Sequence, residues 1–160
     1  MKLHQLLSDL KESEGYKTFK EQNPKAFFAA AFIILDIEKG TEQLQLDFFL
    51  PEKSKVAAFE LPNETPRTHE DEIKEMKPQS TEIKIDIDDI KRKSQEIIAA
   101  NDSAIKPTKI IAVLRDDEWN LTCMDNMLGI IRIRLDANTG EQKSFDKGSL
   151  MDFMGVKKTS

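Results

Sequence analysis

The sequence predicts an α+β fold of two units in tandem, each a helix followed by an antiparallel meander. Residues 109–145 alternate apolar and polar side chains over four short segments separated by turn-forming residues, as in a four-stranded meander. The first half of the chain shows the same order, an amphipathic helical stretch and then three strand-like stretches. With 160 residues and a hydrophobic content of 39%, the chain can bury a core of useful size.

This pattern divides the chain into four segments. A helix and a three-stranded unit are expected over 1–61, a polar linker over 62–81, a helix and a four-stranded meander over 82–148, and a short C-terminal helix with a tail over 149–160. In the last segment Ser149 is the expected N-cap. The apolar residues Leu150, Phe153 and Met154 are expected to dock on the chain's own sheet or on a partner.

One amphipathic helix is expected over 2–22. Its apolar side chains recur at helical spacing, at Leu3, Leu6, Leu7, Leu10 and Phe19. The helix can break near Gly15, because a glycine inside a helix costs about 1 kcal/mol relative to alanine. Asn23 and Pro24 end it.

Three strands are expected over 26–38, 42–50 and 55–61, joined by hairpin turns. The first is apolar on both faces, with Phe27, Ala29, Ala31, Ile33 and Leu35 on one face and Phe28, Ala30, Phe32 and Ile34 on the other. Such a strand is central in its sheet or covered on both sides. The covering layer is the other half of the chain or a second copy of the protein, and packing within the chain is favoured.

Residues 62–81 combine three prolines with dense charge and few apolar groups, which predicts a linker. A turn or two of helix is expected within it at 69–76. His69 stands beside three acids there, and we interpret this run as solvated charge and not as a metal site.

A strand is expected at 82–87, followed by a helix over 89–101 with Asp88 as its N-cap. The acids Asp86, Asp88 and Asp89 could hold a hard cation. Capping and the helix dipole explain them with less charge repulsion, so no metal is expected.

In the meander, Trp119, Leu121 and Cys123 are expected on the buried face, as are Ile131, Ile133 and Leu135 on the next strand. The turns are expected at 116–117, 125–126 and 136–140, where Asp, Asn and Gly residues favour tight reversals. The wet face then carries Asn120, Thr122, Arg132 and Arg134. These four are the candidate contacts for a ligand or partner, and the alternative is a solvated sheet face with cross-strand partners.

The two halves also echo each other in sequence. A shift of 85 positions aligns Leu46, Phe48 and Leu50 with Ile131, Ile133 and Leu135, and a hairpin follows at the same place in both. This pattern predicts a tandem duplication of one helix-on-sheet unit.

The second half carries a W-x-L strand and then an apolar strand ending in D-x-x-T-G-E, formed by Trp119, Leu121, Asp136, Thr139, Gly140 and Glu141. Over residues 88–145 this resembles the PepSY family, and the first half echoes it. The resemblance implies a helix packed on a small antiparallel sheet, a PepSY-like or cystatin-like unit. It also implies that D-x-x-T-G is a hairpin turn and not a catalytic motif.

The reactive residue types are too few and too scattered to predict catalysis. One cysteine excludes an intramolecular disulfide, and Cys123 with His4 and His69 does not make a zinc set. Cys123 lies on the buried strand face, which predicts a core thiol with no base beside it. Phosphate-binding, zinc-hydrolase and serine-hydrolase motifs are absent from the sequence, so neither an enzyme nor a cofactor is expected.

The net charge of −5 and a pI near 5.2 disfavour nucleic acid as a partner, because a negative protein repels phosphate. The sequence has no apolar run of bilayer length, and the first 15 residues carry acids where a signal peptide is apolar. We therefore expect a cytoplasmic protein that does not enter the membrane.

Together these observations favour a non-enzymatic soluble module that binds a protein or peptide through a sheet edge or the groove between its units. A homodimer is left open. One alternative is a small-ligand or enzymatic domain with an apolar pocket, in which Arg132 or Arg134 contacts an anion. The second alternative is a nucleic-acid-associated protein.

Overall fold

The computed structural model describes residues 2–70, 75–101 and 103–149. Its helices and strands are, in chain order, α1 (Leu3–Lys11), α2 (Glu14–Gln22), β1 (Phe27–Asp36), β2 (Thr41–Leu50), β3 (Lys55–Glu60), β4 (Arg67–Glu70), the 3₁₀ helix η1 (Ile87–Asp89), α3 (Ile90–Ala100), β5 (Lys109–Arg115), β6 (Glu118–Met124), β7 (Gly129–Asp136) and β8 (Gln142–Ser149). The predicted α+β class is confirmed.

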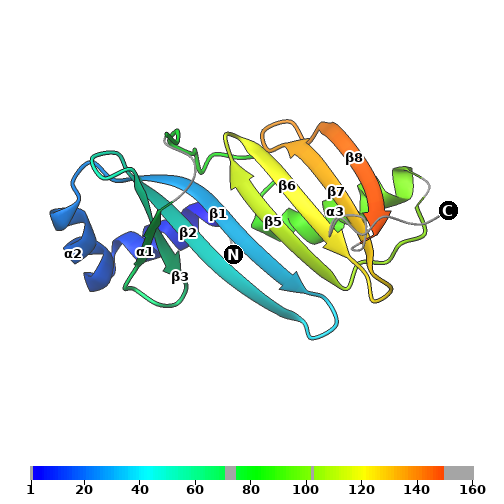
Figure 1. Cartoon of the computed structure of the whole chain (residues 1–160), viewed down its shortest axis with the longest axis horizontal. Helices are drawn as coiled ribbons and strands as arrows, with labels where there is room; N and C mark the ends of the chain where they lie inside the picture. The colour runs from blue at the N-terminus through cyan, green and yellow to red at the C-terminus, as the bar shows by residue number, and fades with distance from the viewer. Residues whose placement is uncertain (1, 71–74, 102, 150–160) are drawn as a thin grey trace.

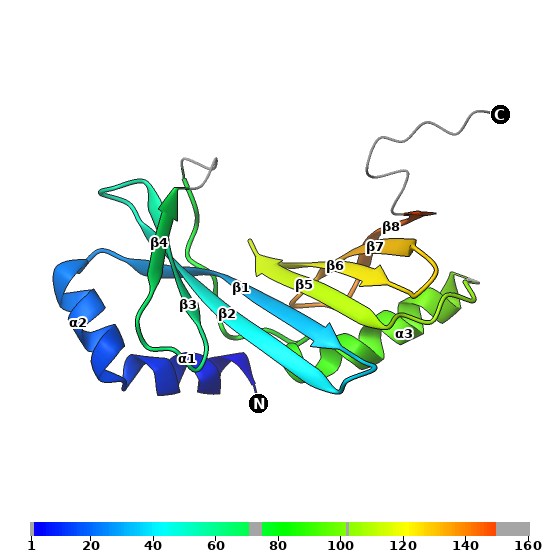
Figure 2. The ribbon, with the colours of Figure 1, turned by 60° about the horizontal axis from the view of Figure 1, so that its bottom comes forward.

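These strands form one antiparallel sheet in the order β4-β3-β2-β1-β5-β6-β7-β8. The two meanders meet where β1 pairs with β5, from Ala31 opposite Leu114 to Asp36 opposite Lys109. All three helices lie on one side of this sheet (Figures 1 and 2). Because β1 has three strands on one side and four on the other, this apolar strand is central in the sheet, as its sequence predicts.

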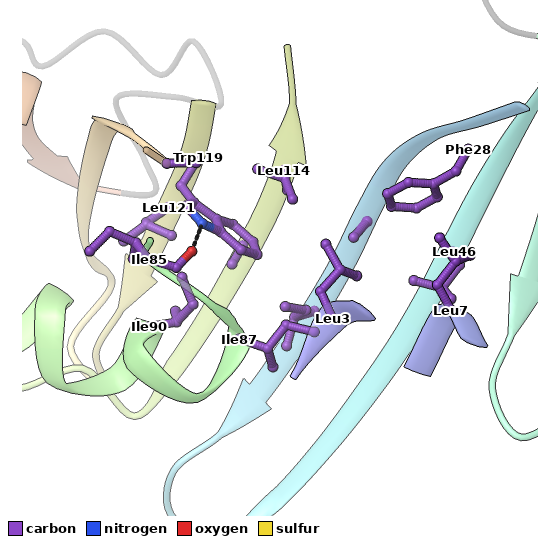
Figure 3. Close-up of a cluster of buried hydrophobic side chains, with 14 of the residues drawn as sticks. Leu3, Leu7, Phe28, Leu46, Ile85, Ile87, Ile90, Leu114, Trp119 and Leu121 are labelled. Atoms are coloured by element: carbon purple, nitrogen blue, oxygen red, sulfur yellow. Dashed lines mark hydrogen bonds between the residues drawn. The ribbon is translucent and has the colours of Figure 1, made fainter. Parts of the chain in front are cut away.

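The main core fills the space between the sheet and the helices, and it runs through both halves of the chain. Figure 3 shows Leu3 of α1 and Ile87 of η1 between side chains of the first half, such as Phe28, and of the second half, such as Leu121. The carboxylate of Asp86 ties these elements together. Its Oδ1 atom accepts hydrogen bonds from the Leu3 amide at 2.8 Å and from the Ile87 amide at 2.8 Å.

The N-terminal helix is divided near Gly15, as expected, but the glycine is not the cause. It is interrupted at residues 12–13, where the Ser13 hydroxyl donates to the Leu10 carbonyl at 2.7 Å and accepts from the Tyr16 amide at 3.2 Å. Ser13 therefore caps α2, since a serine oxygen satisfies an amide that the first turn leaves unpaired. Gly15 lies inside α2, where a Cβ would collide with the backbone carbonyl of Glu64. The glycine is needed for close packing there and does not break the helix.

The predicted alternation of β1 is wrong at its start. The register with β2 shifts between Phe28 and Ala30, which marks a β-bulge. A bulge adds one residue to the strand and so changes which face the following side chains occupy. As a result Phe28 shares the main core with Ala31 and Ile33, while Ala29 lies in a small second cluster on the other face.

The segment expected to be a linker contains strand β4, which pairs with β3 and places His69 opposite Val56. All four β4 residues are exposed, so the strand has no apolar pattern to reveal it. The helix expected at 69–76 does not form at His69 and Glu70, which belong to β4, and residues 71–74 lie outside the described part of the chain.

Residues 82–86 form no strand, although their sequence alternates. Both the Lys84 and the Ile85 amide donate to the Ala137 carbonyl, so this segment crosses the end of β7 instead of extending the sheet. Asp88 is not the N-cap that its position predicts. Asp86 is the cap of η1, and its own amide donates to the Asp89 carboxylate in a reciprocal capping box.

The four-stranded meander of the second half is confirmed, as are its buried faces. Asp116 and Asp117 both have positive φ angles, 53° and 58°, as the tight turn between β5 and β6 requires. Ser149 is the last residue of β8, and the short helix expected after it falls outside the described residues.

Candidate functional site

The four candidate contact residues lie together on the sheet face opposite the helices, which we call the open face. In the pairing of β6 with β7, Asn120 lies opposite Arg134 and Thr122 lies opposite Arg132. Asn120 and both arginines are exposed, and Thr122 is half-buried. The structure thus places these residues on one face, and their role in binding remains a prediction.

The same two rows continue across the junction of the halves as apolar side chains. Val113 pairs with Asn120 and Ile111 pairs with Thr122. On β1, Phe32 lies opposite Val113 and Ile34 opposite Ile111. We call Phe32, Ile34, Ile111 and Val113 the apolar stripe.

The apolar stripe is incompletely covered. The side chain of Phe32 is 36% exposed, and the other three members are half-buried. A single exposed apolar side chain is ordinary, whereas a contiguous group of partly exposed apolar side chains on a sheet face is characteristic of an interaction surface. The sequence signal for this stripe is the apolar character of both faces of β1, which predicts a second covering layer.

Beyond the stripe, the open face becomes polar again on the first half of the chain. Gln45 of β2 pairs with Phe32, and Gln43 pairs with Ile34. A shallow hollow of about 450 Å³ lies here, lined by Phe32, Ile34, Gln43, Leu44, Gln45, Glu60, Leu61 and Asn63. The hollow combines amide and carboxylate oxygens with apolar walls, a lining that accommodates a peptide side chain or a small molecule.

One end of the open face is closed by the chain itself. Met76 packs with Phe27 against the second cluster, formed by Ala29, Phe49 and Val56. The segment that carries Met76 is fixed at Gln79, whose backbone amide donates to the Phe28 carbonyl at 2.9 Å.

The side chain of Gln79 also forms hydrogen bonds with the β5–β6 turn. Its Oε1 accepts from the Asp117 amide at 2.8 Å, and its Nε2 donates to the Asp117 carboxylate at 2.9 Å. Gln79 is buried, and its Nε2 also donates to the Ser80 carbonyl at 2.9 Å, so four hydrogen bonds fix this segment between Phe28 and the β5–β6 turn. The apolar stripe therefore begins where this covering segment stops.

The charges of the open face are partly matched within the sheet. Arg134 binds Glu118 in a two-pronged contact, with Nε to Oε2 at 3.2 Å and Nη2 to Oε1 at 2.9 Å, and the Lys143 ammonium lies 3.4 Å from Oε1. Partial burial raises the pKa of Glu118. The hydrogen bonds from Arg134 and Lys143 lower this pKa by more than burial raises it, so the net shift is downward. Arg134 is thus already engaged with a carboxylate, which weakens its candidacy as an anion contact.

Cys123 lies on the helix side of β6 with no exposed surface, as its strand position predicts. Burial raises the pKa of its thiol from 9.0 to about 12. A thiol of this kind is not ionised at neutral pH and is a poor nucleophile. Among the described residues, no three His, Cys, Asp or Glu side chains come together in a way that could hold a metal ion.

We expect the native protein to resist thiol reagents at Cys123 and to react fully once unfolded.

The raised pKa of Cys123 in the folded protein also predicts a loss of stability at alkaline pH. The neutral thiol's contribution is complete below about pH 9, the unfolded value, and falls as pH rises toward the folded value of about 12. One pH unit in this window corresponds to about 1.4 kcal/mol.

Urea unfolding of the wild type and of Cys123→Ala at neutral pH and at pH values above the unfolded pKa measures this effect. The alanine variant pays a constant cavity cost but lacks the titration, so the stability difference between the two proteins should shrink as pH rises. A difference that stays constant with pH would show that the thiol is not desolvated in the folded state.

Comparisons with known proteins assign no family. Neither the models of protein families nor the curated proteins include a match to this chain. A crystal structure from Clostridium difficile 630, described as a "putative lipoprotein", has 9% sequence identity and a TM-score of 0.49, over 82% of this chain and 89% of that chain. The PepSY resemblance therefore rests on its sequence motif alone.

Within the described residues, no helix has both the length and the apolar content needed to cross a bilayer.

Proposed function

We propose that this chain is a non-enzymatic binding module that holds a protein or peptide partner on the open face of its sheet. The observation that supports this proposal is the apolar stripe at the β1–β5 junction, whose most exposed member is Phe32 at 36%. The stripe is flanked by amides on one side and by Asn120 and Arg132 on the other. An apolar centre with a polar rim is the usual composition of a protein interface.

The open face is a better binding site than either sheet edge. The edge strand β4 has only four residues, all of them polar and exposed. The other edge strand, β8, carries Lys143 at a register irregularity with β7, and Lys147 further along the strand. Short length, edge lysines and bulges are features that prevent a strand from pairing with another chain.

The proposal includes two related units that share one sheet. Leu46, Phe48 and Leu50 of β2 face the helices, and so do Ile131, Ile133 and Leu135 of β7, which the 85-residue shift aligns with them. A tandem duplication of a PepSY-like unit would produce this correspondence. The stripe then lies at the boundary between the units, and a cytoplasmic partner would occupy the inter-unit position.

Replacing Phe32 by glutamate tests this function. A displayed peptide library selected on the full chain supplies ligands, whose dissociation constants are then measured by fluorescence anisotropy. We expect the Phe32→Glu variant to bind selected peptides at least about tenfold more weakly, a loss of about 1.4 kcal/mol, because a charge replaces the most exposed apolar side chain of the stripe.

The matched control is Lys17→Glu on α2, an exposed site on the helix side of the sheet. It should retain the wild-type affinity for the same peptides. Peptides that bind Phe32→Glu as well as the wild type would place the site elsewhere. A library that yields no ligand, together with thermal stabilisation by a metabolite, would favour the small-ligand alternative, for which the hollow beside Phe32 is the available space.

A further inference from the structure

The apolar surface of the open face does not end with the apolar stripe. On β1, Ala29 lies three residues before Phe32, roughly 10 Å along the strand. Ala29 belongs to the second cluster with Phe49 and Val56. The Phe27 ring packs against this cluster, and its centroid lies 5.7 Å from that of Phe49. The second cluster and the stripe are therefore two parts of one apolar surface that follows β1.

One part of this surface is covered by the chain itself. Residues 75–79, which we call the strap, place the half-buried side chain of Met76 on the second cluster. The stripe beyond the strap keeps its exposure, with Phe32 at 36%. The strap therefore occupies apolar sheet surface that is continuous with the candidate binding site.

The two ends of the strap are held very differently. At one end, the buried Gln79 makes the four hydrogen bonds described above. Among the residues that the structure describes, no hydrogen bond or ion pair involves residues 75–78. Glu75 and Lys77 are exposed, and Pro78 has no amide hydrogen to donate. Within the described chain, the contact of the Met76 side chain is what holds this end of the strap on the sheet.

A side chain held in this way is easily exchanged for another. Methionine is unbranched and flexible, so it adapts to many apolar surfaces. A half-buried side chain gains only part of the free energy of full burial. No hydrogen bond between described residues has to break when Met76 leaves the sheet, and Gln79 keeps the strap attached meanwhile.

The surface under the strap is one that a partner on the open face needs. Stable protein interfaces bury roughly 800 Å² on each partner. The apolar stripe offers only four partly exposed side chains. The second cluster would add Phe27 and Phe49, and aromatic side chains are enriched at the centres of interfaces.

We propose that the strap is a displaceable cover that competes with the partner for the open face, an inference that rests on the binding function proposed above. When the partner binds, Met76 leaves the second cluster and an apolar side chain of the partner packs there. The rest of the partner extends along β1 over the stripe. The partner is thus an extended peptide segment with two apolar side chains roughly 10 Å apart, one on the second cluster and one on Phe32.

Peptide selection on two forms of the full chain tests the role of the strap. The same displayed library is selected on the wild type and on Met76→Ser, and dissociation constants are measured by fluorescence anisotropy. We expect peptides whose binding depends on Phe32 to bind Met76→Ser at least about threefold more tightly, because the competing contact within the chain is lost.

The matched control is Met127→Ser, the same change at a methionine that is 87% exposed in the turn between β6 and β7. This variant should bind the peptides like the wild type. Met76→Leu, which retains an apolar contact with the second cluster, should also bind like the wild type.

A thiol placed on the strap reports its movement directly. Cys123 has no exposed surface, so the introduced thiol of the Met76→Cys variant is the more accessible one, and the wild type gives the background rate. A saturating peptide should accelerate the reaction with a thiol reagent several-fold, because displacement exposes the introduced thiol. A slower or unchanged reaction would show that the peptide binds without moving the strap.

The outcomes distinguish the strap from the binding function itself. If Phe32→Glu weakens binding but Met76→Ser binds like the wild type, or if the thiol reaction is not accelerated, the strap is a permanent cover and this inference alone is wrong. Ligands recovered on Met76→Ser but not on the wild type would support a strap that closes the site. If neither form yields a ligand, the binding function and the role of the strap are both wrong.

Discussion

Replacing Trp119 by alanine is expected to lower the free energy of unfolding by about 3–5 kcal/mol, the range for deleting a large buried aromatic side chain. Trp119 has no exposed surface and lies in the main core. Its indole nitrogen donates to the Ile85 carbonyl at 2.7 Å (Figure 3). The tryptophan therefore both fills the core of the second half and holds the irregular segment before η1 against β6.

The Trp119→Phe variant separates these two contributions. Phenylalanine retains most of the apolar contact but leaves the buried Ile85 carbonyl without its donor, at a cost of about 1–3 kcal/mol. Both variants can be followed by urea unfolding with far-ultraviolet circular dichroism, since the only tryptophan is lost. If Trp119→Phe proved as stable as the wild type, the hydrogen bond to Ile85 would not contribute to stability.

The meander around Trp119 could be predicted because its signals are local. Alternation from Trp119 to Cys123 and from Ile131 to Leu135 identifies the buried faces, and these faces are confirmed. The turn residues between the strands identify the hairpins, because each reversal needs only a few neighbouring residues. Local patterns of this kind survive in the fold whenever one face of a strand is buried and the other is wet.

Elements that depend on distant partners could not be predicted in this way. Strand β4 exists because its backbone pairs with β3, and its four exposed side chains carry no apolar pattern. Residues 82–86 alternate like a strand, yet the amides of Lys84 and Ile85 donate to the carbonyl of Ala137, more than 50 positions away. Asp86, not Asp88, is the cap, and it caps η1; its carboxylate also accepts from the amide of Leu3, a partner that helix spacing alone does not reveal.

The candidate binding face was predicted in part. Cross-strand register brings Asn120, Thr122, Arg132 and Arg134 together, as alternation implies. The apolar stripe was missed as part of the same face, since the pairing of β1 with β5 joins strands that are about 75 residues apart. The bulge near Phe28 further reassigned which β1 side chains reach that face.

The second large effect is expected for Phe48→Ala, a loss of about 3–5 kcal/mol. Phe48 is fully buried, and its ring centroid lies 5.4 Å from those of Tyr16 and Phe59 and 5.9 Å from those of Phe19 and Phe28. Ring pairs at these separations stabilise beyond the burial of their area. Removing Phe48 leaves a cavity between β2 and α2, so α2 should lose its hydrogen-exchange protection first.

The matched variant is Phe32→Ala, which deletes the same side chain from the opposite face of the sheet. Phe32 is 36% exposed, so about two thirds of its surface is buried and its removal should cost about 1–2 kcal/mol, less than the removal of Phe48. Parallel urea titrations of the two variants compare the two faces directly. Equal losses would mean that the open face is packed as tightly as the core, and the apolar stripe would then be structural. If Phe32→Ala loses clearly less unfolding free energy than Phe48→Ala, stability does not account for the exposed apolar surface of Phe32. That result would support the proposal that this surface binds a partner.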